Sequence, residues 1–128
     1  MTEPDIPAVK DSESERPIPS AWRPIFISIV DAFVEQDYLL TAGIDGVALV
    51  SEETAKQVKD YIEDYGEILT ALSDETWNTS VCIWMGSYWD VLIDLRTMEE
   101  GQSDMVLGAR VVEEANGFVV HVGMVYVP

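Results

Sequence analysis

The sequence has few of the residues on which common active sites depend. It contains one cysteine, Cys82, and one histidine, His121, among 128 residues. A single cysteine excludes an intrachain disulfide and is typical of a reducing compartment, and a single histidine excludes a two-histidine metal site. No GxGxxG, GxxxxGK[S/T] or GxSxG segment occurs, so the common nucleotide-binding and serine-hydrolase motifs are absent. We therefore expect no metal, no other cofactor and no enzymatic activity.

Basic residues are also scarce. The chain has 7 lysines and arginines against 24 aspartates and glutamates, which gives a formal net charge of −17. This charge repels the phosphates of nucleic acids and anionic lipid headgroups, so neither is an expected direct partner. A basic protein is the expected partner, and the alternative is that the acidity serves solubility alone.

Long apolar runs are missing as well. No segment approaches the ~20 apolar residues that a membrane-spanning helix needs. The first ten residues, MTEPDIPAVK, have neither the basic flank nor the apolar stretch of a secretory signal. These features predict a cytosolic protein.

The chain divides into an arm and one domain. Residues 1–19 hold four of the six prolines, interspersed with acids and serines, and predict a flexible acidic arm that buries no apolar face. Residues 20–128 have the length and apolar content of a single domain. Apolar residues at helical spacing predict one helix from Ser20 to about Gln36. A second helix is predicted from Glu52 to Tyr65, capped by Ser51 and ended by Gly66.

The rest of the chain predicts two β-hairpins. Gly86-Ser87 lies between apolar runs in the stretch Trp77–Leu95 and predicts a type II′ turn that pairs Trp84 with Trp89 and places both on the core face. The opposite face, with Tyr88, Asp90 and others, is mixed and suits a half-exposed surface or a partner site.

Asn116-Gly117 predicts a second turn, which pairs Ala115 with Phe118. This register puts the following residues on one face, with Val125 on the other: Leu107, Val111, Phe118, Val120, Val122, Met124 and Tyr126. Residues 96–104 are polar and predict a surface loop. The expected fold class is α+β, with two N-terminal helices packed on a four-stranded antiparallel meander and the first helix on the Trp84/Trp89 face.

Acidic residues near the first hairpin are the main candidates for a site. Cys82 with His121 as a nucleophile and base is disfavoured, because Cys82 is assigned to the core. The acids either are solvated surface groups or recognise a basic surface. A divalent-cation site or an acid/base pair is a less favoured alternative, because the spacing matches no EF-hand loop and Asp90 and Asp94 are ~13 Å apart along a strand. The predicted partner-binding residues are Tyr88, Asp90, Asp94, Glu99, Glu100, Ser103 and Asp104.

Three motifs resemble a known family. They are W-x-x-S-V-x-x-W at 77–84, W-x-V-x-x-D-L at 89–95, and E-E-G-x-S-D-M at 99–105. As a set they resemble a family of small bacterial domains associated with immunity-type proteins. The resemblance implies a cytosolic protein that neutralises a cognate toxin by binding it, and it carries over no catalytic residue.

Other functions stay open at this point. A structural domain would bury the mixed hairpin face against a second copy as a homodimer. A nucleic-acid mimic would present spaced carboxylates to a DNA- or RNA-binding protein. An enzyme would need a polar pocket with shifted pKa values.

Overall fold

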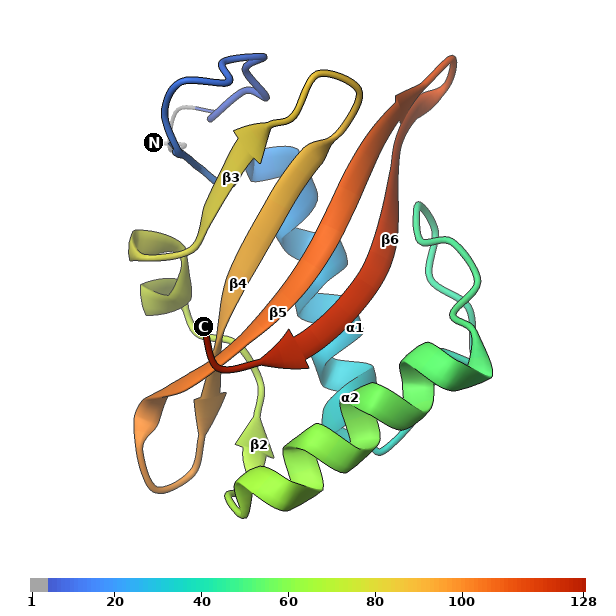
Figure 1. Cartoon of the computed structure of the whole chain (residues 1–128), viewed down its shortest axis with the longest axis vertical. Helices are drawn as coiled ribbons and strands as arrows, with labels where there is room; N and C mark the ends of the chain where they lie inside the picture. The colour runs from blue at the N-terminus through green and yellow to red at the C-terminus, as the bar shows by residue number, and fades with distance from the viewer. Residues whose placement is uncertain (1–4) are drawn as a thin grey trace.

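The computed structural model describes residues 5–128, which form an α+β domain with two α-helices and a six-stranded antiparallel sheet (Figure 1). The helices are α1 (Arg23–Val34) and α2 (Glu52–Tyr65), with short 3-10 helices at Ser20–Trp22 and Asp74–Asn78. The strands are β1 (Arg16–Pro17), β2 (Leu69–Thr70), β3 (Val81–Trp84), β4 (Trp89–Thr97), β5 (Gly101–Glu114) and β6 (Gly117–Tyr126).

The four long strands follow one another in the sheet. The strand order is β1-β3-β4-β5-β6, and β2 pairs with β4 beyond the end of β3. The α+β class is therefore confirmed, whereas the predicted strand number of four was too low. The two additional strands have two residues each, which is too short for a hydrophobic pattern to reveal them.

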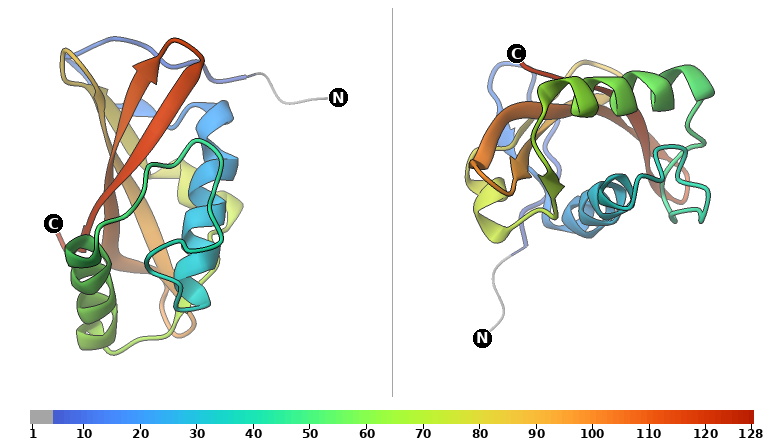
Figure 2. Two further views of the ribbon diagram at one scale, coloured as in Figure 1. Left: turned by 90° about the vertical axis from the view of Figure 1, so that its right-hand side faces the viewer. Right: turned by 90° about the horizontal axis from the view of Figure 1, so that it is seen from below.

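Helix α1 covers one face of the sheet, which we call the inner face (Figure 2). Its buried side chains are Phe26, Ile29, Val30 and Phe33. The indole of Trp22 meets that of Trp89 edge to face at 5.3 Å. The predicted helix from Ser20 to Gln36 is shorter in the structure, because its first turn is a 3-10 turn and the α-helix ends at Val34.

Helix α2 has the predicted bounds, and it lies along the β6 edge of the sheet (Figure 1). The Ser51 hydroxyl accepts a hydrogen bond from the Thr54 amide at 3.1 Å, and Gly66 ends the helix with a φ of 84°. Both signals act within a few residues of the helix ends, which is why its bounds could be predicted from the sequence.

The outer edge of β6 is hydrogen-bonded near both ends. The Gln57 side-chain amide donates to the Val125 carbonyl at 2.7 Å, and the Val125 amide donates to Gln57 Oε1 at 3.0 Å. Farther along, the Ala48 amide donates to the Val120 carbonyl at 2.9 Å and the Val120 amide to the Gly46 carbonyl at 2.7 Å. A side chain and a loop thus replace a neighbouring strand.

The β3–β4 hairpin confirms the predicted register. Trp84 pairs with Trp89, and the Met85 amide donates to the Tyr88 carbonyl at 2.8 Å. Gly86 has a φ of 99°, as the first central position of the predicted turn requires. Trp89 is buried as expected, and Trp84 is half-buried with its ring 4.5 Å from that of Trp89.

The turn of the second hairpin lies one residue earlier than predicted, so the predicted pairing of β5 with β6 is wrong by two residues. Glu114 pairs with Gly117, so the turn residues are Ala115 and Asn116. Gly123 is an extra residue in β6, because Gly108 pairs with Met124 while Ala109 pairs with Val122. The bulge reverses the alternation, so Val125 is buried, Met124 is exposed and Tyr126 turns to the outer face.

The predicted loop at residues 96–104 is mostly strand. β4 continues to Thr97 and β5 begins at Gly101, which leaves only residues 98–100 between them. Side-chain hydrogen bonds stabilise this tight connection, since the Glu100 amide donates to Thr97 Oγ1 at 3.3 Å and the Ser103 hydroxyl donates to the Leu95 carbonyl at 2.8 Å.

The N-terminal segment contacts the domain at several points. Ile18 is fully buried, which corrects the expectation that residues 1–19 bury no apolar group. β1 pairs with β3, and the Trp89 indole donates to the Val9 carbonyl at 3.0 Å. Residues 1–4 lie outside the described part of the chain, and the predicted division at residue 20 stays a prediction.

Candidate functional site

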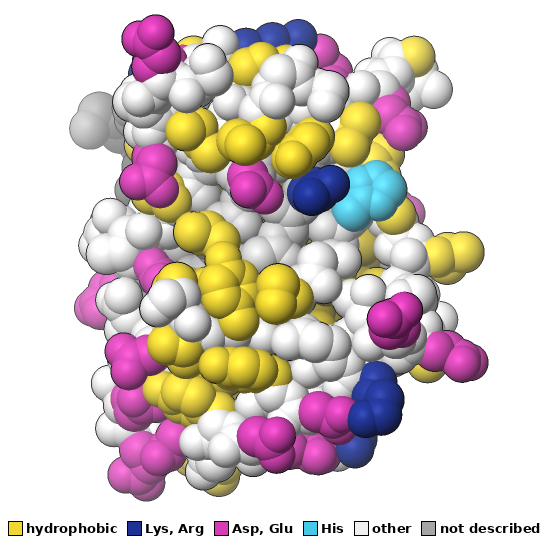
Figure 3. All heavy atoms as spheres, in the orientation of Figure 1, with side chains coloured by type: hydrophobic (Ala, Val, Ile, Leu, Met, Phe, Trp, Pro, Cys, Tyr) yellow, Lys and Arg dark blue, Asp and Glu magenta, His cyan; other side chains and the backbone are white. Residues whose placement is uncertain are grey.

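The face of the sheet opposite α1, which we call the outer face, carries many half-buried or exposed apolar side chains. Alternation along β4 points Asp90, Leu92 and Asp94 outward, because Trp89, Val91, Ile93 and Leu95 are buried. Apolar side chains form bands across this face (Figure 3). The outward apolar residues are Val81, Ile83, Met85, Tyr88, Leu92, Val112, Val119, Met124 and Tyr126.

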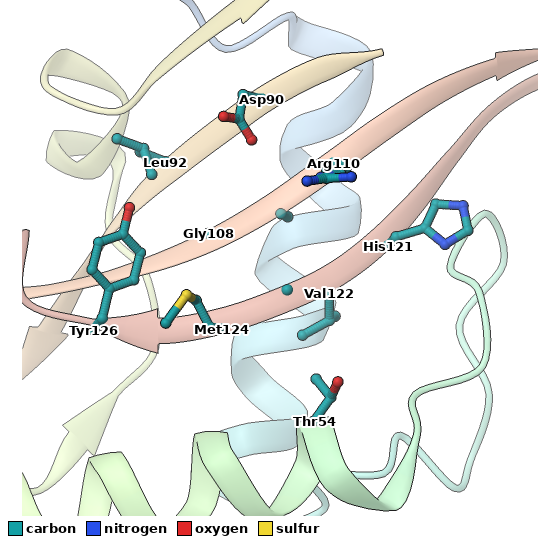
Figure 4. Close-up of a pocket in the computed structure, with 11 residues that line it drawn as sticks. Thr54, Asp90, Leu92, Gly108, Arg110, His121, Val122, Met124 and Tyr126 are labelled. Carbon is teal, nitrogen blue, oxygen red and sulfur yellow. The ribbon is translucent and has the colours of Figure 1, made fainter. Parts of the chain in front are cut away.

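A groove of about 500 Å³ lies on this face across β4, β5 and β6 (Figure 4). A Cβ atom on Gly108 would lie 3.2 Å from Tyr126 Cε1, and one on Gly123 would lie 2.8 Å from the Gly108 carbonyl oxygen. The two glycines therefore permit a close backbone approach at the bulge and leave the groove without side chains at its centre. The lining residues are Thr54, Asp90, Leu92, Gly108, Ala109, Arg110, His121, Val122, Gly123, Met124 and Tyr126.

A polar row crosses the upper part of the groove and consists of Asp90, Arg110 and His121. Asp90 pairs directly with Arg110 across β4 and β5, and Arg110 pairs directly with His121 across β5 and β6. Directly opposed residues have Cβ atoms ~5 Å apart. The Arg110 guanidinium lies 4.5 Å from the centre of the Tyr88 ring, a cation–π distance. Within residues 5–128, none of the three side chains in the row makes an ion pair or hydrogen bond to another residue.

Arg110 differs from the other lysines and arginines, each of which has an ion pair or a hydrogen bond within residues 5–128. Five of the seven lysines and arginines pair with acids, as follows: Lys10 with Glu113, Arg16 with Asp11, Lys56 with Asp60, Lys59 with Glu63, and Arg96 with Glu75. The sixth, Arg23, donates to the Ile18 carbonyl at 3.0 Å. Among the described residues, Arg110 is thus the base whose guanidinium has no polar partner, although the chain is strongly acidic.

The predicted partner-binding residues do not form one surface. Tyr88 and Asp90 lie at the β3–β4 turn, whereas Glu99 and Glu100 lie in the β4–β5 turn at the opposite end of the sheet. Asp104 lies in β5 between these two ends. The strand residues between Asp90 and the 98–100 turn span ~25 Å.

Three of the predicted residues, Asp94, Ser103 and Glu100, are buried or make hydrogen bonds within the domain. Asp94 lies midway along β4, where its carboxylate accepts a hydrogen bond from Thr79. Ser103 is buried in β5. Glu100 accepts a hydrogen bond from the Tyr65 hydroxyl at 2.9 Å, so its carboxylate is partly committed to the fold.

Cys82 and His121 cannot act together. Cys82 is buried on the inner face, where its thiol donates to the Pro17 carbonyl at 3.6 Å, while His121 lies on the outer face. Burial raises the pKa of the Cys82 thiol to about 11, so the sulfur stays protonated at neutral pH. No group of three or more His, Cys, Asp or Glu in residues 5–128 is arranged to hold a metal ion.

The groove contains residues that the sequence-based prediction missed. Arg110, Met124 and Tyr126 were not among the predicted site residues, and only Asp90 was. A signal was present, since Arg110 and Gly108 interrupt the otherwise apolar stretch 105–112, and Gly123 interrupts the apolar residues of the next strand. The bulge that brings Tyr126 over Gly108 could not be located from alternation alone.

Comparisons with known proteins give the family. No helix among the described residues is long and apolar enough to cross a membrane. No curated protein and no solved structure matches this chain. Residues 30–128 match the family described as "Domain of unknown function (DUF7668)". Since the match covers well over half of the chain, the protein belongs to the DUF7668 family.

Proposed function

We propose that this chain is a non-catalytic binding domain that binds a basic protein through the outer face of its sheet. The observation that carries the proposal is a broad sheet face, left uncovered by the described elements, with Arg110, Met124 and Tyr126 near its centre and Tyr88 against Arg110. Tyrosine, methionine and arginine are enriched at the centres of protein interfaces, where they supply most of the binding energy.

The charge of the chain supports a basic partner. The outward Asp94, Asp104 and Glu114 add acids around the apolar centre, and the whole chain has a net charge of −17. A field of this sign accelerates association with a basic surface. The same charge opposes a homodimer, because two copies would bring equal negative charges together.

The biological role that we propose is neutralisation of a basic toxin in the bacterial cytosol by covering its surface. The support for this role is the sequence resemblance to immunity-type domains, together with the acidity. A partner that normally binds nucleic acid fits the same surface, because its basic patch would meet spaced carboxylates.

A pair of matched variants tests the docking face. Met124 and Met98 are both exposed methionines, at 44% and 67%, but Met124 lies on the outer face and Met98 in the β4–β5 turn. The parent, Met124→Asp and Met98→Asp serve as baits for a lysate of the source organism. We expect the parent and Met98→Asp to retain the same basic protein in a 1:1 ratio, and Met124→Asp to lose it, because a buried unpaired carboxylate is costly.

Calorimetry with the purified partner then gives the affinities. We expect Met124→Asp to weaken binding at least about tenfold, which corresponds to ~1.4 kcal/mol. Equal binding by both variants would place the docking site elsewhere. Capture of only a second copy of the chain would replace the proposal with self-association.

A further inference from the structure

The groove contains two neighbouring side chains of opposite charge that form no ion pair. Asp90 and Arg110 are directly opposed across β4 and β5, yet they form no ion pair, because the guanidinium lies over the Tyr88 ring instead. Both side chains are exposed. The two charges are therefore available to a ligand that carries their complements.

A ligand with one charge suits this arrangement poorly. A carboxylate that approaches Arg110 also meets the Asp90 carboxylate at close range, and an amine that approaches Asp90 meets Arg110. Like charges in such proximity repel, whereas a ligand with both charges gains two attractive contacts. An α-amino acid carries a carboxylate and an ammonium group on one carbon, so it can present one to each.

The groove beside the two charges is apolar. Leu92, Met124 and Tyr126 line it (Figure 4), and the absence of a side chain on Gly108 lets the Tyr126 ring lie close against the sheet. Its volume of about 500 Å³ falls within the range of small-molecule sites, ~300–1,000 Å³. An apolar or aromatic side chain of a bound ligand would be removed from water here.

We propose that the groove binds a free α-amino acid with an apolar or aromatic side chain. Arg110 holds its carboxylate, Asp90 holds its ammonium group, and Leu92, Met124 and Tyr126 contact its side chain. His121, next to Arg110 in the polar row, provides a further polar contact for the carboxylate. This inference goes beyond the proposed docking of a basic protein, and its test requires no protein partner.

Three small probes separate the contributions of the two charges. L-phenylalanine carries both charges, N-acetyl-L-phenylalanine lacks the ammonium, and L-phenylalaninamide lacks the carboxylate. We titrate each into the ¹⁵N-labelled chain and follow the amide signals, up to about 10 mM for a ligand of millimolar affinity. We expect L-phenylalanine to shift the signals of Gly108, Arg110, His121 and Gly123, and each single-charge probe to bind at least about tenfold more weakly.

Variants then assign the contacts. Arg110→Met keeps the stem of the side chain over Tyr88, and Asp90→Asn keeps the shape of the carboxyl group, so both should fold. We expect each to weaken L-phenylalanine binding at least about tenfold. Lys56→Met, a charge-matched control on the exposed side of α2, should bind like the parent.

Several outcomes would overturn the inference. They are the absence of shifts with L-phenylalanine, shifts confined to residues outside the groove, and equal binding of N-acetyl-L-phenylalanine and L-phenylalanine. Tighter binding by Asp90→Asn would show that the ligand is a simple carboxylate. If L-phenylalanine does not bind, the partner-capture experiment with Met124→Asp can still succeed. If that experiment fails, L-phenylalanine can still bind, so the two proposals are tested independently.

Discussion

Single residues decide which side chains reach the outer face. Gly123 inserts one position into β6, and this insertion turns Met124 and Tyr126 outward. Alternation of apolar residues predicted the opposite orientation, because a period of two cannot reveal where an extra residue is inserted. The register of the first hairpin was predicted correctly, since Gly86 fixes the turn and no bulge intervenes between β3 and β4. Its predicted start at Trp77 was wrong, because Trp77 lies in a 3-10 helix and β3 begins at Val81.

The buried Cys82 thiol makes stability depend on alkaline pH. Its folded pKa of about 11 exceeds the ordinary value of 9.0 because burial disfavours the thiolate. A raised folded pKa contributes stability that is complete below about pH 9 and is lost as the pH rises through about 11, a change of ~3 kcal/mol.

Urea unfolding of the parent and Cys82→Ala at several pH values between about 8 and 11 measures this effect. We expect the parent to lose more stability than the variant over this range, because the groups other than Cys82 titrate in both proteins. Parallel pH profiles would show that the thiol does not titrate as its burial implies.

Among the elements, those with local signals were predicted best. The bounds of α2 follow from a serine cap and a terminal glycine, both of which act within a few residues. The first four residues of β5 were missed, because Gln102 and Asp104 are polar and exposed while Ser103 is buried through a hydrogen bond to Leu95. That bond joins two strands, so the local sequence does not reveal it.

The contact between helix α2 and strand β6 leads to a prediction about stability. Gln57 satisfies both the amide and the carbonyl of the buried Val125. We expect Gln57→Ala to lower the free energy of unfolding by about 1–3 kcal/mol, because both backbone groups lose their partners.

Lys59→Ala, an exposed change on the same helix, should cost ~0.5 kcal/mol or less. Urea unfolding measures both changes, and hydrogen exchange of the Val125 amide locates the effect. If exchange of the Val125 amide is as slow in Gln57→Ala as in the parent, the side chain does not protect this edge.

For the whole molecule, the fold class and the sequential pairing of β3 to β6 were predictable from turns and periodicity. The candidate site was not, because it depends on which positions of three strands become neighbours. Asp90, Arg110 and His121 are up to 31 positions apart in the chain but consecutive across the sheet. The predicted acidic surface failed for the opposite reason. Its residues are close in sequence and were expected to lie together, but they are spread between the two ends of β4.

The separation of these acids leads to a prediction about association. Glu99 and Glu100 lie ~25 Å of strand away from Asp90, farther than the ~8 Å screening length at about 0.15 M salt. We therefore expect Glu99→Ala/Glu100→Ala to bind the proposed basic partner nearly as fast as the parent at this salt concentration.

At about 0.01 M salt the screening length grows to ~30 Å, and the same variant should associate more slowly. Stopped-flow or surface-binding kinetics at both salt concentrations provide the measurement. A large loss of on-rate at the higher salt would show that the partner contacts the β4–β5 turn directly.

The protection of the sheet edges limits how this chain can associate. Along β6, Gln57 and the Gly46–Ala48 loop occupy backbone groups, and at the opposite edge β1 offers only Arg16 and a proline, which lacks an N–H. Strand addition from a second molecule is therefore obstructed on both sides. Even at high concentration, the chain should resist growth into cross-β filaments, although its outer face stays open.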